Sequence, residues 1–215
     1  MNQVNSSLFF LAILISYQTF AYTPSEGKVS AIIGPYLYKT NFSDSAAGAH
    51  SPYFGDIGLI AQGDLNSNGG LEIGIFHMNK LFFRESGGNY IAEKTELISV
   101  TLGYRYWMNP YLAAGLSFYS SYSIGNPVVE HSDFPLGGNI DTSARDTTEY
   151  GFDLSLQSEV WSRNHQAIIL DARYSISVTN KENEQANHYA LLIGYKYMIQ
   201  EKYPEKPVRR AKPKP

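Results

Sequence analysis

The stretch LISVTLGYRYWMNPYLAAGLSFYSSY, residues 97–122, alternates in polarity on both sides of a two-residue break at Asn109-Pro110. Before the break, the apolar positions are Ile98, Val100, Leu102, Tyr104 and Tyr106. The positions between them are Ser99, Thr101, Gly103 and Arg105. Because the side chains of a β-strand point alternately to its two faces, this period of two predicts a hairpin with one apolar and one polar face. Its aromatic rings gather at the tight turn, and the rest of the chain has to show which face lies outside.

The same alternation recurs along the chain after Tyr22. The segments that show it are Lys28–Thr40, Tyr53–Leu65, Gly70–Phe83, Thr95–Met108, Tyr111–Tyr122, Thr148–Ser162, Ala167–Thr179 and His188–Ile199. Each is long enough to cross a bilayer as a tilted strand, which takes about 9–11 residues.

The connections between these segments alternate in length. Residues 66–69, 109–110 and 163–165 make short connections, whereas residues 41–52, 84–94, 123–147 and 180–187 make longer polar ones. Short and long connections therefore lie at opposite ends of the strands. This pattern predicts an all-β fold, an eight-stranded antiparallel transmembrane β-barrel over residues 22–200, with short periplasmic turns and longer extracellular loops. The alternative is a soluble periplasmic barrel or sandwich with its apolar face inward; it is disfavoured because the charges lie on the polar face.

The polar faces supply a set of inward charges. They are Glu72, Arg105, Asp153, Glu159, Asp171, Arg173 and Lys196. Buried charges must be paired, so we expect a polar network across the lumen. Counting residues from the turns predicts that Glu72 meets Arg105, that Arg173 lies diagonal to Asp153, and that Lys196 lies close to Asp171. The network predicts an inert plug, with a narrow conduit for small solutes as the alternative.

Aromatic residues mark the two predicted membrane interfaces, where tyrosine and tryptophan place an apolar body in the acyl chains. The predicted periplasmic girdle consists of Tyr104, Tyr106, Trp107, Tyr111, Trp161, Tyr195 and Tyr197. Candidates for the outer girdle are Tyr53, Phe82, Phe83, Tyr119, Tyr150 and Tyr189.

From Lys28 to Ile199 the chain resembles the small eight-stranded outer-membrane barrels of OmpA and OmpX type. Its last segment is similar to the assembly signal of that class, because Gly194 is followed at +3 and +5 by Tyr197 and Ile199. The resemblance implies location in the outer membrane of a Gram-negative bacterium. It also implies contact with outer-membrane lipid and lipopolysaccharide, and recognition of the last strand by the barrel assembly machinery.

The two ends of the chain differ from this pattern. Residues 1–21, MNQVNSSLFFLAILISYQTFA, have a short apolar run and small residues before Tyr22, which predicts a cleaved signal peptide; a membrane anchor is the alternative. Residues 201–215, EKYPEKPVRRAKPKP, predict a disordered basic, proline-rich periplasmic tail. The net charge of −3 gives no indication of nucleic-acid binding, and the absence of cysteine excludes disulfides and thiolate chemistry.

Candidate catalytic residues are few. His77 shares the outward face of Leu71, Ile73 and Ile75 and is the one place for a lipid-facing active site, but no serine is an obvious partner. The HSD sequence at residues 131–133 lies in a predicted loop, and no histidine pair has metal-ligand spacing on one strand face. We therefore expect no enzyme activity, no metal and no cofactor, with a lipid-modifying barrel enzyme as the alternative.

The connection 123–147 is the candidate site for an extracellular partner. It has about 25 residues, is acidic and contains Pro127 and Pro135. Loops longer than about 12–15 residues tend to be functional or disordered. The sequence thus predicts a structural or surface-interaction role, of the adhesin or receptor kind.

Overall fold

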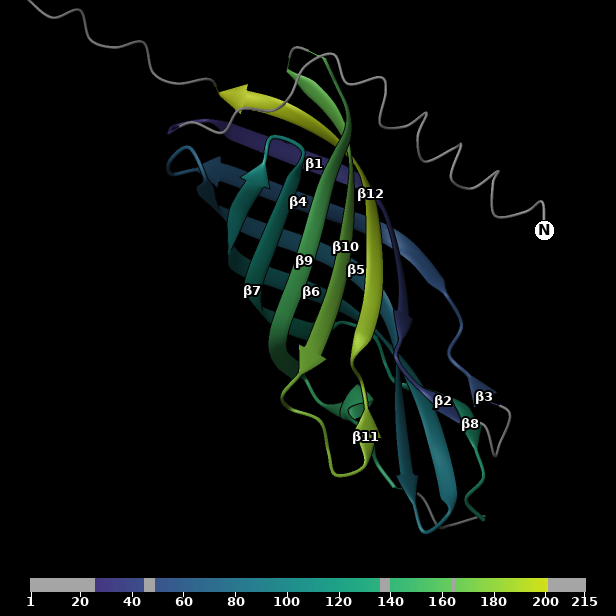
Figure 1. Ribbon diagram of the computed structural model, residues 1–215. Coiled ribbons are helices and arrows are strands. Elements are labelled where there is room, and N and C mark those ends of the chain that lie inside the picture. The colour runs from purple at the N-terminus through teal and green to yellow at the C-terminus, as the bar shows by residue number, and fades with distance from the viewer. Residues whose placement is uncertain (1–25, 45–48, 136–139, 164, 201–215) are drawn as a thin grey trace, which may run out of the picture.

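Antiparallel strands close into a barrel in the computed structural model, which describes residues 26–44, 49–135, 140–163 and 165–200 (Figure 1). The barrel strands are β1 (Val29–Thr40), β4 (Phe54–Asp64), β5 (Gly69–Ser86), β6 (Asn89–Asn109), β7 (Leu112–Ser123), β9 (Thr148–Arg163), β10 (Gln166–Ser177) and β12 (His188–Gln200). The connections contain β2 (Ser43–Asp44), β3 (Ala49–His50), β8 (Val128–Ser132), β11 (Glu184–Gln185) and a 3₁₀ turn, η1 (Ser143–Arg145). Within the described ranges, no helix is both long and apolar enough to span a membrane.

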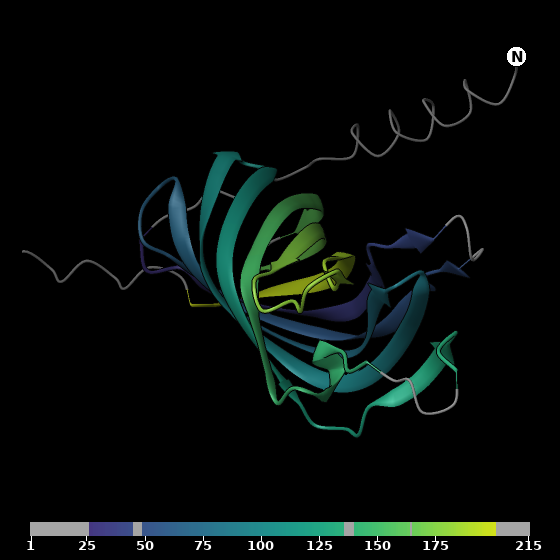
Figure 2. The ribbon, with the colours of Figure 1, turned by 90° about the horizontal axis from the view of Figure 1, so that it is seen from below.

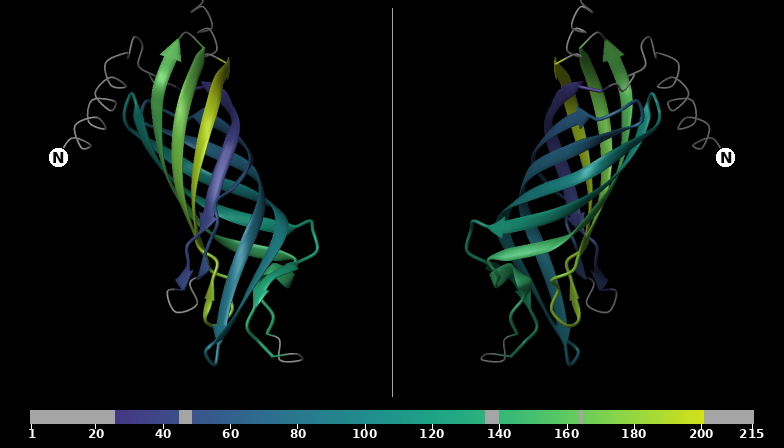
Figure 3. Two further views of the ribbon diagram at one scale, coloured as in Figure 1. Left: turned by 90° about the vertical axis from the view of Figure 1, so that its right-hand side faces the viewer. Right: turned by 90° about the vertical axis from the view of Figure 1, so that its left-hand side faces the viewer.

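Each barrel strand pairs with its neighbour in the chain, and the first strand pairs with the last. β1 lies antiparallel to β12, with Ala31 opposite Tyr197 and Thr40 opposite His188. Figure 3 shows the strands inclined to the barrel axis, and Figure 2 shows them surrounding the interior. This closure gives every barrel strand a partner on both sides. The prediction of an eight-stranded antiparallel barrel is confirmed.

The apolar face of the strands lies outside. Leu154 and Leu170 are 47% and 36% exposed, while the side chains of Asp171 and Arg173 point inward and are almost completely buried. A soluble barrel would have the reverse arrangement, because it would bury its apolar face. The structure therefore presents a continuous apolar wall, as the alternation predicts.

The two ends of the barrel differ in their connections, but one connection that the sequence predicts to be long is a tight turn. We call the end with the short connections the turn end and the opposite one the loop end. Residues 84–94 do not form a loop, because β5 and β6 stay paired as far as Ser86 and Asn89. Gly87 and Gly88 make the tight turn with positive φ, which glycine adopts without strain. The prediction of a long connection at residues 84–94 was wrong, because these residues continue β5 and β6 as a paired hairpin.

The β5–β6 hairpin leaves the barrel wall near the loop end. Pairing between β4 and β5 stops at Gly58 and Phe76. Beyond this point, side chains of β1 satisfy the edge of β5: the Thr40 hydroxyl donates to the carbonyl of Leu81 at 2.7 Å, and the Tyr38 hydroxyl accepts from the N–H of Asn79. Polar side chains thus replace a missing backbone partner.

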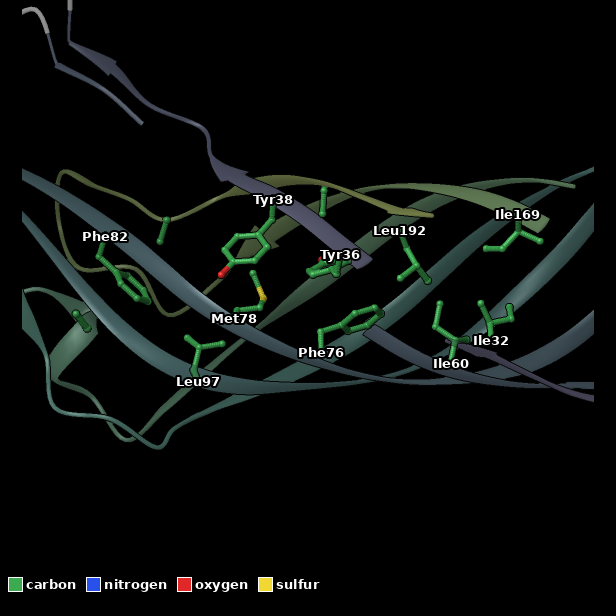
Figure 4. Close-up of a cluster of buried hydrophobic side chains, with 13 residues drawn as sticks. Ile32, Tyr36, Tyr38, Ile60, Phe76, Met78, Phe82, Leu97, Ile169 and Leu192 are labelled. Carbon is green, nitrogen blue, oxygen red and sulfur yellow. The ribbon is translucent and has the colours of Figure 1, made fainter. Parts of the chain in front are cut away.

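An apolar layer fills part of the interior. Tyr36 and Phe76 lie with ring centroids 4.5 Å apart, and Ile32, Ile60 and Leu192 are fully buried beside them. Figure 4 shows these side chains gathered in the interior, and they come from the neighbouring strands β12, β1, β4 and β5. The interior is therefore layered, with an apolar zone that the sequence reasoning did not predict.

The seam between β1 and β12 requires glycine at position 34. A Cβ at Gly34 would lie 2.0 Å from the carbonyl oxygen of Ile193, which is backbone and has little freedom to move. We expect Gly34→Ala to lower the free energy of unfolding by about 1–3 kcal/mol, as overpacking does. Urea unfolding in lipid vesicles measures this change. Gly63→Ala is the matched control, because nothing lies within 4 Å of its added Cβ; equal losses for both variants would contradict the packing at the seam.

The predicted signal peptide, residues 1–21, and the predicted tail, residues 201–215, lie outside the described residues. Both stay predictions.

Candidate functional site: the lumen and the loop end

Four charged residues from three strands, β5, β9 and β10, meet in the lumen. Arg173 of β10 donates to Glu72 of β5 at 2.5 Å, to Asp153 of β9 at 2.8 Å and to Asp171 at 3.1 Å. All four side chains are almost completely buried, so a single guanidinium contacts three buried carboxylates. Because β5 and β10 are on opposite sides of the barrel, the Arg173–Glu72 bond crosses the lumen.

A second arginine completes this ionic network. Arg105 of β6 also contacts Glu72, through its Nε at 2.7 Å, and its Nη2 lies 3.2 Å from Asp171. The amide of Gln62 donates to Glu72 at 3.0 Å and to Gln157 at 3.1 Å. The sequence counting placed Glu72 beside Arg105 and Arg173 beside Asp153, and the structure brings both pairs together.

Lys196 lies elsewhere than predicted. Its Nζ is 3.6 Å from Glu159 of β9 and 5.0 Å from the centre of the Trp107 ring. Asp171 is opposite Leu192, two inward positions further from the turn end than Lys196, which is opposite Ala167. The predicted proximity of Lys196 to Asp171 was wrong because the register of β12 against β10 shifts it toward the turn end.

Trp107 is not part of the aromatic girdle. It is 3% exposed and points into the lumen, since it alternates with the outward Tyr106. Its assignment to the girdle was wrong because it followed from nearness to the turn and ignored strand parity. The other proposed members, Tyr104, Tyr106, Trp161, Tyr195 and Tyr197, are 38–50% exposed on the outer wall, and Tyr111 is half-buried.

The outer girdle needs a similar correction. Tyr119 and Phe82 point inward and are 2% and 1% exposed, whereas Phe83 is buried beneath Phe42 with ring centroids 4.6 Å apart. Their placement in the girdle was wrong. Tyr53, Tyr150 and Tyr189 are exposed on the outer wall.

A second buried ion pair lies nearer the loop end. The Lys80 ammonium of β5 is 2.5 Å from Glu149 of β9, and the Tyr119 hydroxyl donates to the same carboxylate at 2.9 Å. Sequence reasoning missed Lys80 and Glu149. Strand parity was the available signal, because both residues occupy inward positions at the ends of the segments that alternate.

The connection 123–147 returns over the mouth of the barrel. η1 lies at this mouth, where Thr142 and Ala144 are 0% and 1% exposed. The Thr142 hydroxyl donates to Glu93 of β6 at 2.6 Å, and Arg145 donates to the same carboxylate at 2.6 Å. The Ser143 N–H donates to Glu184 of β11 at 2.7 Å. We call this group, Thr142 to Arg145 with Glu93 and Glu184, the outer closure.

Exposed ion pairs surround the outer closure. Asp141 is 2.7 Å from Lys181 and 3.0 Å from Arg84, and Lys181 also lies 3.2 Å from Asp146. The hydrogen bond from Lys181 holds the pKa of Asp141 below its ordinary value. These contacts join the connection 123–147 to the connection between β10 and β12.

The loop end continues into a sheet beyond the barrel. The extended β5–β6 hairpin carries β11 beside β5 and β8 beside β6. On one face, rings stack in the order Phe42, Phe83, Tyr90 and His131, with neighbouring centroids 4.6, 5.0 and 4.8 Å apart. We call β11, the extended hairpin and β8 the outer sheet. These ring contacts give the outer sheet an aromatic core of its own, so it presents a folded surface.

His77 lies where the hairpin leaves the wall. Its Nδ1 is 2.5 Å from Asp56 of β4, and its Nε2 is 2.7 Å from Glu96 of β6. Both ring nitrogens are therefore engaged by carboxylates. Among the described residues, no three His, Asp or Glu side chains are arranged to hold a metal ion.

No model of a known protein family matches the chain, and no curated protein matches it. Several solved structures are similar. The outer membrane protein OprG from Pseudomonas aeruginosa is 12% identical, with 83% of this chain and 99% of that chain covered and a TM-score of 0.55. Ail of Yersinia pestis, in complex with the heparin analogue sucrose octasulfate, is 16% identical over 80% and 99%, with a TM-score of 0.45. The outer membrane protein AlkL is 11% identical over 89% and 99%, with a TM-score of 0.42.

The likeness to OprG extends over nearly all of that chain and concerns the fold, not the residues. The chain has the fold of a small eight-stranded antiparallel outer-membrane barrel.

Proposed function

We propose that this barrel has a filled lumen and serves to bind an extracellular partner through the outer sheet. The observation that carries the proposal is the structure of the loop end. β5 and β6 extend beyond the barrel wall and hold β8 and β11 in a sheet with its own aromatic core. A folded extracellular surface on a closed barrel is suited to recognition.

The contents of the lumen support its being closed to solutes. The ionic network joins opposite walls through Arg173 and Glu72, and the apolar layer at Phe76 lies directly against it, with the Arg173 guanidinium 4.9 Å from the ring centre. The outer closure adds a third level at the mouth. An eight-stranded barrel has just enough interior for side chains to fill, so three such levels leave little room for a conducting path.

The surroundings of His77 support a role without chemistry. A lipid-modifying enzyme needs a base with a free ring nitrogen to accept the proton of a hydroxyl nucleophile. Asp56 and Glu96 occupy both nitrogens of His77, so the imidazole is held as a bridge between two carboxylates.

β8 is the part of the outer sheet best placed to contact a partner. All five of its residues are exposed, and in the part of the chain that the structure describes it pairs with β6 alone. Val128 and Val129, which point to opposite faces, are 54% and 47% exposed. A strand with a free edge offers unpaired backbone groups to a partner chain.

Replacing Val128–Ser132 by a glycine–serine segment of equal length tests this proposal. We expect the variant to fold and reach the outer membrane, because the outer closure and the barrel do not depend on β8. Adherence of bacteria that express it to epithelial cells or immobilised matrix protein should fall to the level of bacteria without the barrel. The assay counts adherent cells, and heat-modifiable gel mobility verifies folding.

Single substitutions on the two faces of β8 sharpen the test. Val128→Lys and Val129→Lys should differ in effect, because a partner that packs on one face touches only one of them. Undiminished adherence of the folded replacement variant would contradict the proposal.

A further inference from the structure

A groove lies on the lipid-facing wall between β9, β10 and β12. It has a volume of about 350 Å³ and is lined on its outer side by Leu154, Leu156, Ala172, Tyr174 and Tyr189. The groove exists because the side chain of Ala172 is small. Ala172 is opposite Leu156 on β9 and Leu191 on β12. Large side chains around a small one leave a hollow that only an apolar group fills favourably.

Two tyrosines, with their rings in tilted contact, form the edge of the groove toward the loop end. Tyr174 and Tyr189 are opposite each other on β10 and β12, with ring centroids 4.8 Å apart. The amide of Asn41 lies 3.5 Å from the Tyr174 hydroxyl. Tyrosines with an apolar body and a polar tip mark the level at which acyl chains meet headgroups.

Lys39 lies next to these tyrosines on the same wall. It is opposite Tyr189, and its ammonium is 5.3 Å from the centre of the Tyr53 ring. Among the described residues, no carboxylate forms an ion pair with Lys39, whereas Lys80, Lys94, Lys181 and Lys196 each have one. A lysine at this level extends its stem along apolar surface and places its charge among the headgroups.

The register relates the cation to the groove. Ala172 is opposite Leu191, which is opposite Leu37, and Lys39 is the next outward residue of β1 toward the loop end. A lipid whose chain occupies the groove and whose headgroup points to the loop end therefore has that headgroup on the side of Lys39 and Tyr53.

We propose that this wall is a binding site for lipid A, the phosphorylated acyl anchor of lipopolysaccharide. One acyl chain fills the groove at Ala172, and a phosphate binds the Lys39 ammonium, with the exposed Tyr53 beside its sugar. The loop end faces the outer leaflet, which contains this lipid. An anionic headgroup complements a cation that has no carboxylate of its own.

Native mass spectrometry of the purified, folded full-length protein tests the site with lipid A as the probe. We expect one saturable lipid A to bind the wild-type barrel. Lys39→Gln should weaken its apparent affinity about fivefold, the loss of one headgroup charge contact, and Lys39→Arg should restore it. Ala172→Leu should abolish saturable binding, because the added side chain fills the groove.

The matched control is Ala114→Leu, since Ala114 is also opposite Leu156 but on β7, away from the groove. It should bind lipid A as the wild type does. Equal loss in Ala114→Leu and Ala172→Leu would overturn the site, as would unchanged binding in Ala172→Leu. Equal affinity for phosphatidylethanolamine and lipid A would also overturn it, since the groove would then hold any acyl chain. None of these outcomes affects the role of the outer sheet, because adherence is measured separately.

Discussion

Arg173→Ala should lower the free energy of unfolding by about 3–5 kcal/mol, the usual effect of removing one partner from a buried ion pair. The reason is that Arg173 holds Glu72, Asp153 and Asp171 at 2.5, 2.8 and 3.1 Å, and alanine leaves Asp153 without its arginine partner. Arg105 still reaches the other two carboxylates, but it is on the far side of the network. Urea unfolding of the barrel in lipid vesicles measures the change.

Arg84→Ala is the matched control, because Arg84 also binds a carboxylate, Asp141, but at the exposed rim. It should cost about 0–1 kcal/mol. Equal losses for the two variants would contradict the buried network. Planar-bilayer recordings on the same proteins separate a plug from a conduit: we expect rare, small openings from the wild type, and a steady ohmic current would contradict the filled lumen.

The strands and their faces could be predicted from the sequence because a period of two fixes which residues share a side. Leu154 and Asp153 are adjacent in the chain and lie on opposite sides of the wall for that reason. Pairs on neighbouring strands, such as Glu72 with Arg105, followed from counting residues from a short turn. The same counting failed for Lys196, because Lys196 lies four residues along β12 from the residue that is opposite Asp171.

Contacts across the lumen and at the loop end could not be predicted in this way. Arg173 meets Glu72 from the opposite wall, and that distance depends on the curvature of the closed barrel. Arg145 reaches Glu93 only because the connection 123–147 returns over the mouth. The alternation of apolar and polar residues along a strand does not predict either contact. The apolar layer at Phe76 is different, because strand parity could have predicted it: the inward positions there are apolar.

The surroundings of His77 show why residue type alone suggested chemistry. A histidine on an apolar face resembles a catalytic base until its partners are known. In the structure it joins β4, β5 and β6 at the point where β4 and β5 separate, with Asp56 and Glu96 on its two nitrogens. His77 therefore lies where the backbone pairing of β4 and β5 ends, and its contacts with Asp56 and Glu96 hold the three strands together there.

Leu170→Arg should lower the free energy of unfolding by about 2–4 kcal/mol, the cost of an arginine near the bilayer midplane of a barrel. Leu154→Arg should cost less, because Leu154 is opposite Tyr174 and lies nearer the headgroups. Both leucines lie in mid-strand on the outer wall, 47% and 36% exposed to lipid. Either substitution puts a guanidinium into acyl chains, where only snorkelling or local thinning of the bilayer relieves it. Urea unfolding in vesicles again provides the measurement.

Ile199→Arg is the depth control, because Ile199 is also outward, 63% exposed, but lies at the end of β12 near the turn-end interface. There the same substitution should cost about 0–1 kcal/mol, since the cation reaches the headgroups. A graded cost, large at Leu170, smaller at Leu154 and smallest at Ile199, would establish that the apolar wall faces a bilayer and where its midplane lies. A barrel that tolerated arginine equally at all three positions would have this wall outside the membrane.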